Sequence, residues 1–258
     1  MSLTLKLALT PLLVAQALLT RSRMARLPEA EGERQGQWGR GPRLRLLIAG
    51  DSSAAGVGVV LQRDALAGQL VPLLARATSH RVHWQLVAQS GLSTAATLQL
   101  LQSQTLAHFD LALVVTGVND VVEQVPSHHA VLAREALANH CRNALGVQHV
   151  VFAPLPPVHD MHGLPQPLRW VAGSDARRHD RALQHWVATR GDVSRVHVPM
   201  RLNRGVLASD GFHPGEPVYR QSAVAMAEHI AAQMVRLHGG RHGSTSTQRQ
   251  GLADTLTF

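Results

Sequence analysis

The sequence has little of what builds disulfide frameworks or base-stacking surfaces. Cys141 is the single cysteine among 258 residues, which excludes an internal disulfide framework and a zinc site built from several cysteines. Aromatic residues make up only 3% of the chain, which argues against a surface that stacks nucleic-acid bases. The net charge of +8 is spread along the chain without a dense basic run. We therefore expect no nucleic-acid partner and at most a weak attraction to an acidic surface such as anionic lipid.

The remaining composition is that of a globular domain. Hydrophobic residues make up 45% of the chain, and the length is sufficient for one domain with a full core. We predict a single folded domain over residues 43–238. An apolar helix over residues 1–27 and a polar, glycine-rich linker over residues 28–42 precede it. A disordered tail rich in Gly, Ser, Thr and Gln follows over residues 239–258.

The N-terminal segment has two interpretations. Residues 5–19 are mostly apolar but include one lysine, one proline and one glutamine, and they are short for a membrane-spanning helix of about 20 residues. In a secretory signal peptide, residues 15–17 (AQA) would be the cleavage site, and the domain would be periplasmic or secreted. The arginines that follow, Arg21, Arg23 and Arg26, favour an uncleaved helix with the domain on the cytoplasmic side. We expect membrane association at the cytoplasmic face and keep the signal peptide as the alternative.

Strand-like and helical patterns alternate along the domain. Short apolar or alternating runs that end at glycine or polar turns predict strands at residues 44–49, 82–88, 110–115, 147–153 and 195–198. Helical spacing and capping residues predict helices at residues 64–77, 94–106, 127–145, 168–189 and 216–237. Strands that alternate with helices indicate a parallel sheet covered on both faces. The expected fold is a three-layer α/β/α sandwich of the flavodoxin-like kind, with about five parallel strands.

The most informative stretch ends the first predicted strand, where the apolar run over residues 44–49 meets Gly50-Asp51-Ser52. Ligands bind outside the carboxyl ends of the strands in open α/β sheets, so a serine at this position can act as a nucleophile. An alternative exists for the same residues. Ser52 could instead cap the following helix, and Ser53 would then be the nucleophile.

Three further turns provide the groups that a serine nucleophile requires. A serine hydroxyl needs a base within hydrogen-bond reach, and His213 can be that base. Asp210, three residues earlier, can hold the imidazole and stabilise its charged form. The oxyanion of a tetrahedral intermediate needs fixed donors, and the candidates are the Ser52 N–H, the Gly91 N–H and the Asn119 side-chain amide.

Four sequence blocks in this order resemble those of the SGNH hydrolase superfamily, also called GDSL-type esterases and lipases. The blocks are Gly50-Asp51-Ser52, Ser90-Gly91, Gly117-Val118-Asn119-Asp120 and Asp210-Gly211-Phe212-His213. The resemblance spans residues 43–237 and implies a serine ester hydrolase of carboxylic esters that works without a metal or an organic cofactor. It implies Ser52 as the nucleophile, Asp210 and His213 as the rest of the triad, and Gly91 and Asn119 in the oxyanion hole. Ser53 stands where the eponymous motif has leucine, which bears on the subgroup.

Other interpretations remain for some of these residues. We interpret Asp120 as mainly structural. His159, Asp160 and His162 could form a metal site, although solvated loop residues are the preferred interpretation. The loop over residues 154–167 follows the fourth predicted strand and could form a wall of the acyl pocket. A different function class is a non-catalytic lipid-binding or membrane-docking module on a hydrolase scaffold, against which the complete set of catalytic residue types argues.

Overall fold

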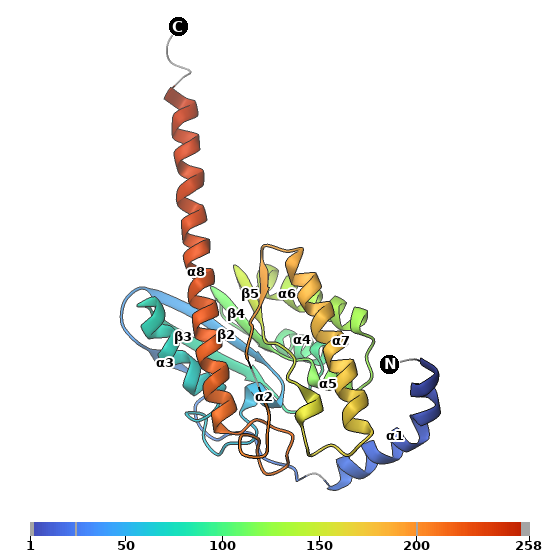
Figure 1. Cartoon of the computed structure of the whole chain (residues 1–258). Helices are drawn as coiled ribbons and strands as arrows, with labels where there is room; N and C mark the ends of the chain where they lie inside the picture. The colour runs from blue at the N-terminus through green and yellow to red at the C-terminus, as the bar shows by residue number, and fades with distance from the viewer. Residues whose placement is uncertain (1–2, 24, 200, 254–258) are drawn as a thin grey trace.

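A six-stranded sheet forms the centre of the molecule (Figure 1). The computed structural model of the chain describes residues 3–23, 25–199 and 201–253. The strand order is β1-β3-β2-β4-β5-β6, and every pairing except the antiparallel β1–β3 pair is parallel. The strands are β1 (Gln35–Trp38), β2 (Arg43–Gly50), β3 (Arg81–Ala88), β4 (Leu111–Val115), β5 (His149–Phe152) and β6 (Val193–Arg195). The predicted three-layer α/β fold is confirmed, with six strands rather than about five.

The additional strand, β1, lies in the segment expected to be a linker. Residues 35–38 pair antiparallel with β3, and all four residues are exposed. Their sequence, QGQW, lacks the alternation of apolar and polar residues that indicates a strand, because this edge strand buries neither of its faces. The last strand, β6, also begins two residues before the predicted run at residues 195–198.

Helices cover both faces of the sheet (Figure 1). Residues of α3 and α8 pack on one face, whereas residues of α4, α6 and α7 pack on the other. The two short helices α2 and α5 follow β2 and β4 directly. The helices are α1 (Leu3–Arg23), α2 (Ser52–Ala55), α3 (Leu66–Thr78), α4 (Thr94–Gln102), α5 (Val118–Val122), α6 (Ser127–Leu145), α7 (Leu168–Ala188) and α8 (Glu216–Ala253), with a 3-10 turn at Val158–Asp160.

Alternate residues of β2 enter two separate cores. Leu46 and Ile48 belong to the core beneath α3 and α8, whereas Leu47 and Ala49 belong to the core beneath α4 and α6, and none of the four is exposed. Burial on both faces explains why the strand is a continuous apolar run rather than an alternating one. Cys141 lies in the second core.

The described part of the chain begins with helix α1 and ends with helix α8. Among the described residues, no helix combines the length and apolar character needed to cross a membrane. The Gln16 side chain of α1 joins the chain ahead of α7, donating to the Gln166 carbonyl and accepting from the Leu168 N–H.

Helix α8 runs to Ala253, through the segment expected to be a disordered tail, and projects from the rest of the molecule (Figure 1). Leu237, where the predicted helix ends, packs against the core. The apolar pattern therefore predicted α8 as far as this residue. The last five residues of the expected tail, 254–258, lie outside the described residues.

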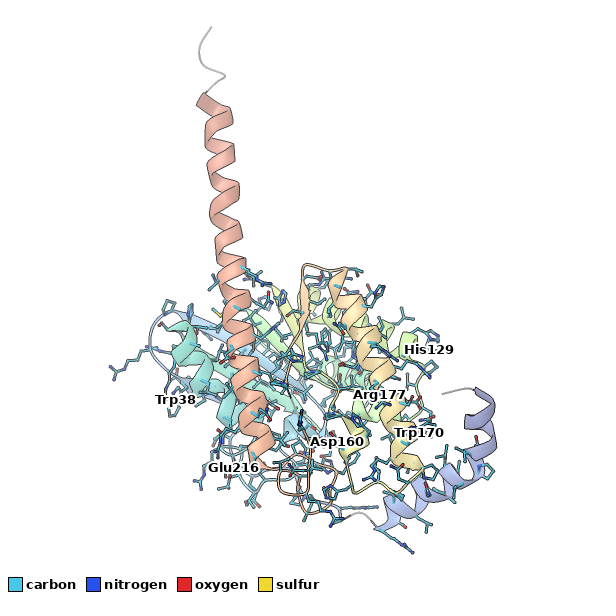
Figure 2. The ribbon with its side chains drawn as sticks, in the orientation of Figure 1. Trp38, His129, Asp160, Trp170, Arg177 and Glu216 are labelled. Atoms are coloured by element: carbon cyan, nitrogen blue, oxygen red, sulfur yellow. The ribbon has the colours of Figure 1, made fainter. Side chains whose placement is uncertain are left out.

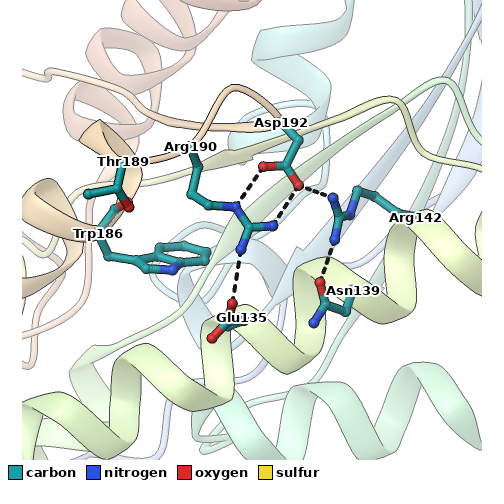
Figure 3. A network of polar contacts seen from close by, with 7 residues as sticks. All are labelled: Glu135, Asn139, Arg142, Trp186, Thr189, Arg190 and Asp192. Atoms are coloured by element: carbon teal, nitrogen blue, oxygen red, sulfur yellow. Dashed lines mark hydrogen bonds and ion pairs between the residues drawn. The ribbon is translucent and has the colours of Figure 1, made fainter.

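A network of partly exposed charges joins α6, the end of α7 and the start of β6 (Figure 3). Arg190 donates from Nε and Nη2 to the two carboxylate oxygens of Asp192, at 2.9 Å each, and from Nη1 to Glu135 at 2.9 Å. Arg142 also pairs with Asp192. Since Asp192 immediately precedes β6, this network lies at the edge of the sheet where the parallel strands begin.

Candidate active site

Three connections leave the sheet at the carboxyl ends of its central parallel strands, at the point where the strand order reverses. β2 pairs with β3 on one side and with β4 on the other, so the connections after these strands run to different faces of the sheet. Ligands bind in the crevice that such a reversal creates. The connections after β2, β3 and β4 carry Ser52 in α2, Gly91 in a loop and Asn119 in α5, respectively.

Ser52 is the first residue of α2, and the cap of this helix is its neighbour Asp51. The Asp51 carboxylate accepts a hydrogen bond of 3.0 Å from the Ser53 N–H, which leaves the Ser52 hydroxyl available. Ser52 Oγ lies 3.1 Å from His213 Nε2. Burial raises the pKa of Asp51 to about 7, although the Ser53 N–H and the charge of His213 favour the carboxylate. The cap therefore titrates near neutrality beside the imidazole.

The aspartate–histidine turn approaches Ser52 from the far end of the sequence. Asp210 Oδ2 lies 2.5 Å from His213 Nδ1, and Oδ1 accepts from the N–H groups of Phe212 and His213. The Asp210 side chain is fully buried. Burial raises its pKa, but the hydrogen bonds with the His213 ring and the two N–H groups outweigh burial and hold the pKa below its usual range. Asp210 is therefore ionised and holds His213 with its other ring nitrogen directed at Ser52.

The two outer oxyanion candidates lie on neighbouring loops that are bonded to each other. Asn119 Nδ2 donates to the Leu92 carbonyl at 2.9 Å, and Leu92 directly follows Gly91. An amide nitrogen carries two hydrogens, so this contact orients the group while using one of them. Gly91 is exposed and has a positive φ of 84°.

Asp120 accepts hydrogen bonds from Thr94, at the far end of the connection that carries Gly91, which confirms its structural interpretation. Its carboxylate accepts from the Thr94 N–H at 2.8 Å and from the Thr94 hydroxyl at 2.6 Å, at the start of α4. It also forms an ion pair of 3.4 Å with Arg134 of α6. Both charged side chains are buried, at 2% and 1% exposure. A Cβ on Gly117, whose φ is +127°, would lie 2.5 Å from Arg134 Nη2, so Arg134 fills the space beneath this loop.

Sequence reasoning did not identify Arg134. An arginine within a helix is ordinarily expected to be exposed. Arg134 nevertheless lies four residues after Ala130 and three before Leu137, which is the spacing of the buried face of α6. Its partner Asp120 lies in one of the four sequence blocks, so the sequence indicated only one residue of this ion pair.

The loop over residues 154–167 packs against the aspartate–histidine turn. The Gly163 N–H donates to the Gly211 carbonyl at 2.9 Å, and Met161 shares a small apolar cluster with Leu207 and Phe212. The loop therefore supports the turn that carries Asp210 and His213. Its role as a wall of the acyl pocket stays a prediction.

The alternative metal site is not formed in the part of the chain that the structure describes, where no group of three His, Cys, Asp or Glu side chains is arranged to hold a metal ion. His159 Nδ1 lies 3.2 Å from an Arg177 guanidinium nitrogen, and Asp160 lies near the same helix α7 (Figure 2). His162 instead lies against the backbone of Gly211.

Known proteins share a family model and a fold with this chain. A model of the GDSL-like lipase/acylhydrolase family matches residues 48–221. Among solved structures, the lipase Lip_vut3 from a goat rumen metagenome has 16% identity and a TM-score of 0.57, with 73% of this chain and 97% of that chain covered. A carbohydrate esterase family 2 enzyme of Corynascus thermopiles has 16% identity and a TM-score of 0.58, covering 76% and 68%. A family 3 carbohydrate esterase of Clostridium thermocellum has 15% identity and a TM-score of 0.55, covering 75% and 98%.

Identities this low show a shared fold and nothing finer. No curated protein matches the chain significantly. The family match, in contrast, covers more than half of the 258 residues and includes Ser52, Gly91, Asn119 and the turn over residues 210–213. The chain belongs to the GDSL-like lipase/acylhydrolase family.

Proposed function

We propose that this chain is a serine ester hydrolase in which Ser52 attacks the carbonyl carbon of a carboxylic ester. The observation that carries the proposal is the continuous hydrogen-bonded series from Ser52 Oγ through His213 to Asp210. His213 Nε2 takes the hydroxyl proton as the C–O bond forms, and the buried Asp210 carboxylate stabilises the resulting imidazolium. His213 then returns the proton to the leaving alkoxide, leaving an acyl group on Ser52.

The second half of the reaction removes that acyl group. His213 takes a proton from water, the hydroxide attacks the acyl carbonyl, and Ser52 leaves with the proton that His213 returns. In both halves a negative charge develops on the carbonyl oxygen. We assign its stabilisation to the Ser52 N–H, the Gly91 N–H and the Asn119 amide. No step calls for a metal or an organic cofactor.

The family and the names of the fold relatives, which are a lipase and two carbohydrate esterases, support a substrate class. We propose a small-molecule or lipid-like carboxylic ester. Short acyl esters, lysophospholipids, acyl thioesters and acetylated sugars all present a carbonyl to Ser52. A chain-length panel that includes lysolipids and acetylated sugars separates them.

We also propose that α1 associates with an anionic membrane surface at the cytoplasmic face. Leu12, Val14, Leu18 and Leu19 of α1 are exposed, and the chain carries a net charge of +8. Cosedimentation with vesicles that contain anionic lipid tests this, and vesicles of neutral lipid are the control. A mature N-terminus at Leu18 by mass spectrometry would instead establish the signal-peptide alternative.

The decisive experiment replaces the nucleophile. Ser52→Ala should abolish hydrolysis of p-nitrophenyl esters and leave the thermal unfolding midpoint close to that of the wild type. A fluorophosphonate probe should label the wild type and not the variant. Full activity in Ser52→Ala would refute the assignment, and an unlabelled, inactive wild type would favour the non-catalytic lipid-binding alternative.

A further inference from the structure

A side chain from outside the family match holds the loop that carries Gly91. This Gly91 loop, residues 89–93, connects β3 to α4. Glu29 Oε1 accepts from the Ser90 N–H at 2.6 Å and from the Ser90 hydroxyl at 2.8 Å. Residue 29 lies 19 positions before the start of the family match at residue 48, in the segment that the sequence suggested was a linker.

The other oxygen of the same carboxylate is held by an arginine. Arg34 Nη2 pairs with Glu29 Oε2 at 2.5 Å, and Arg34 Nη1 donates to the Ala88 carbonyl at 2.9 Å. Burial raises the pKa of Glu29, but the hydrogen bonds from Ser90 and the ion pair with Arg34 outweigh burial and hold the pKa below its usual range. Glu29 is therefore ionised at neutral pH, and the pair fixes the chain from Ala88 to Ser90 at two points.

Gly91 itself has no packing that could fix its orientation. It is exposed, its φ is +84°, and a Cβ built on it would meet no described atom within 4 Å. Its two neighbours carry the constraints, because Glu29 binds Ser90 and the Asn119 amide binds the Leu92 carbonyl. The Gly91 N–H lies in the peptide plane between Ser90 and Gly91, so its direction depends on the contacts that hold the chain at Ser90 before it and at Leu92 after it.

On the basis of the proposed function, we infer that Glu29, held by its ion pair with Arg34, is a positioning residue of the oxyanion hole. It touches no reacting atom. It fixes Ser90 so that the Gly91 N–H points to the position of the developing oxyanion, where a small misplacement greatly slows the reaction. The segment before the family match thus completes the active site. Cleavage of a signal peptide after Ala17 would leave Glu29 and Arg34 in the chain.

The test replaces Glu29 and compares ground-state with transition-state binding. Glu29→Ala should lower kcat about tenfold to a hundredfold, less than or similar to the loss of one oxyanion donor, with KM changed less than about twofold. Affinity for an alkyl boronic acid, which forms a tetrahedral adduct with a nucleophilic serine, should fall in parallel with kcat. Glu29→Gln should recover part of the loss, because its amide oxygen can still accept from Ser90. Rates are divided by the concentration of sites that a fluorophosphonate titrates to completion.

The matched control is Glu33→Ala, which removes an exposed carboxylate that has no hydrogen bond or ion pair to a side chain in the described part of the chain. It should leave kcat unchanged. The Glu29→Ala/Asn119→Ala double variant should lose less than the product of the two single losses, because both act on one oxyanion.

Two outcomes would overturn the inference. One is a kcat per titrated site in Glu29→Ala equal to that of Glu33→Ala. The other is a loss in Glu29→Ala that multiplies independently with that of Asn119→Ala. Should Glu29→Ala fail to fold, Ser90→Ala removes only the hydroxyl contact and should still lower kcat by about twofold to fivefold, whereas an unchanged kcat would count against the inference. The Ser52→Ala variant tests the nucleophile separately, so failure of the two proposals can be told apart.

Discussion

Arg134 and Glu135, which are adjacent in α6, belong to two different ion-pair clusters, one buried and one partly exposed to water. Arg134 turns inward to Asp120, which lies next to Asn119, and the two side chains are 1% and 2% exposed. Glu135 turns outward to the network of Arg190 and Asp192 at the other edge of the sheet (Figure 3), where the side chains are 22–38% exposed. Both clusters link α6 to another element, and only the first is closed off from water.

The two environments give the same kind of ion pair different consequences. The guanidinium nitrogens of Arg134 have no hydrogen-bond partner among the described residues, and burial lowers its pKa against the opposing charges of Asp120 and Asp180. Loss of one partner would leave an uncompensated buried charge. Arg190 instead has three short contacts and access to water, so its contribution to stability is small. The difference indicates that the buried charge fixes the connections that carry Gly91 and Asn119, whereas the surface network joins α6 to the segment between α7 and β6.

The largest effect is expected from removing the buried cation. Arg134→Met should lower the free energy of unfolding by about 3–5 kcal/mol, because the Asp120 carboxylate stays buried without its counter-charge. Denaturant unfolding in urea measures this change. The Asp120→Asn/Arg134→Met double variant should be more stable than Arg134→Met alone, since the stranded charge is gone. A double variant less stable than the single one would contradict the buried-charge explanation.

The second effect concerns the reaction barrier rather than folding. Asn119→Ala should raise the barrier by about 3 kcal/mol, the usual loss for one oxyanion donor. It should lower the free energy of unfolding by only about 1 kcal/mol, because the side chain makes one hydrogen bond, to the Leu92 carbonyl. Steady-state kinetics and urea unfolding of the same preparation separate the two quantities. An equal loss in both would mean that Asn119 acts as a structural residue.

Sequence reasoning was sufficient for the fold and for the residues that we propose react. Ser52, Gly91 and Asn119 follow apolar strands, and parallel strands bring such positions to one edge of the sheet. The DxxH turn supplied Asp210 and His213 through its chemistry alone. These predictions use local sequence patterns together with one rule of sheet topology, and a single sequence is sufficient for both.

The contacts of Glu29 and Arg134 were not predicted, because they join residues that lie far apart in the sequence. Glu29 and Ser90 are 61 positions apart, and the polar, glycine-rich sequence around Glu29 is also that of a flexible linker. The burial of Arg134 depends on the gap beneath Gly117, which exists only after α6 has packed. Helical spacing places Arg134 on the buried face of α6, but the partner of a buried or distant side chain follows from tertiary packing, which no local pattern contains.

A smaller effect concerns the pH dependence of the buried region. Burial, and next the charge of Arg134, lower the pKa of His179, whose side chain is buried in α7. The unfolded chain, with an ordinary histidine pKa of about 6.5, therefore takes up the proton first as the pH falls. The stability that neutral His179 contributes is complete above this pH and is lost below it, at no more than about 1.4 kcal/mol per pH unit. His179→Gln should show a shallower decline in the free energy of unfolding between pH 7 and pH 5, and an unchanged slope would contradict this.

The smallest effect on stability is expected from the partly exposed network of Arg190, which is the counterpart of the buried Arg134 pair. Arg190→Ala should lower the free energy of unfolding by about 1 kcal/mol or less, because water and salt screen partly exposed ion pairs. The loss should shrink further when urea unfolding is repeated in about 1 M sodium chloride, where the screening length is about 3 Å. It should leave kcat unchanged, since Arg190 lies at the edge of the sheet away from Ser52. A loss as large as that of Arg134→Met would show that burial is not what separates the two clusters, and the role assigned to the buried pair would then have to come from its position alone.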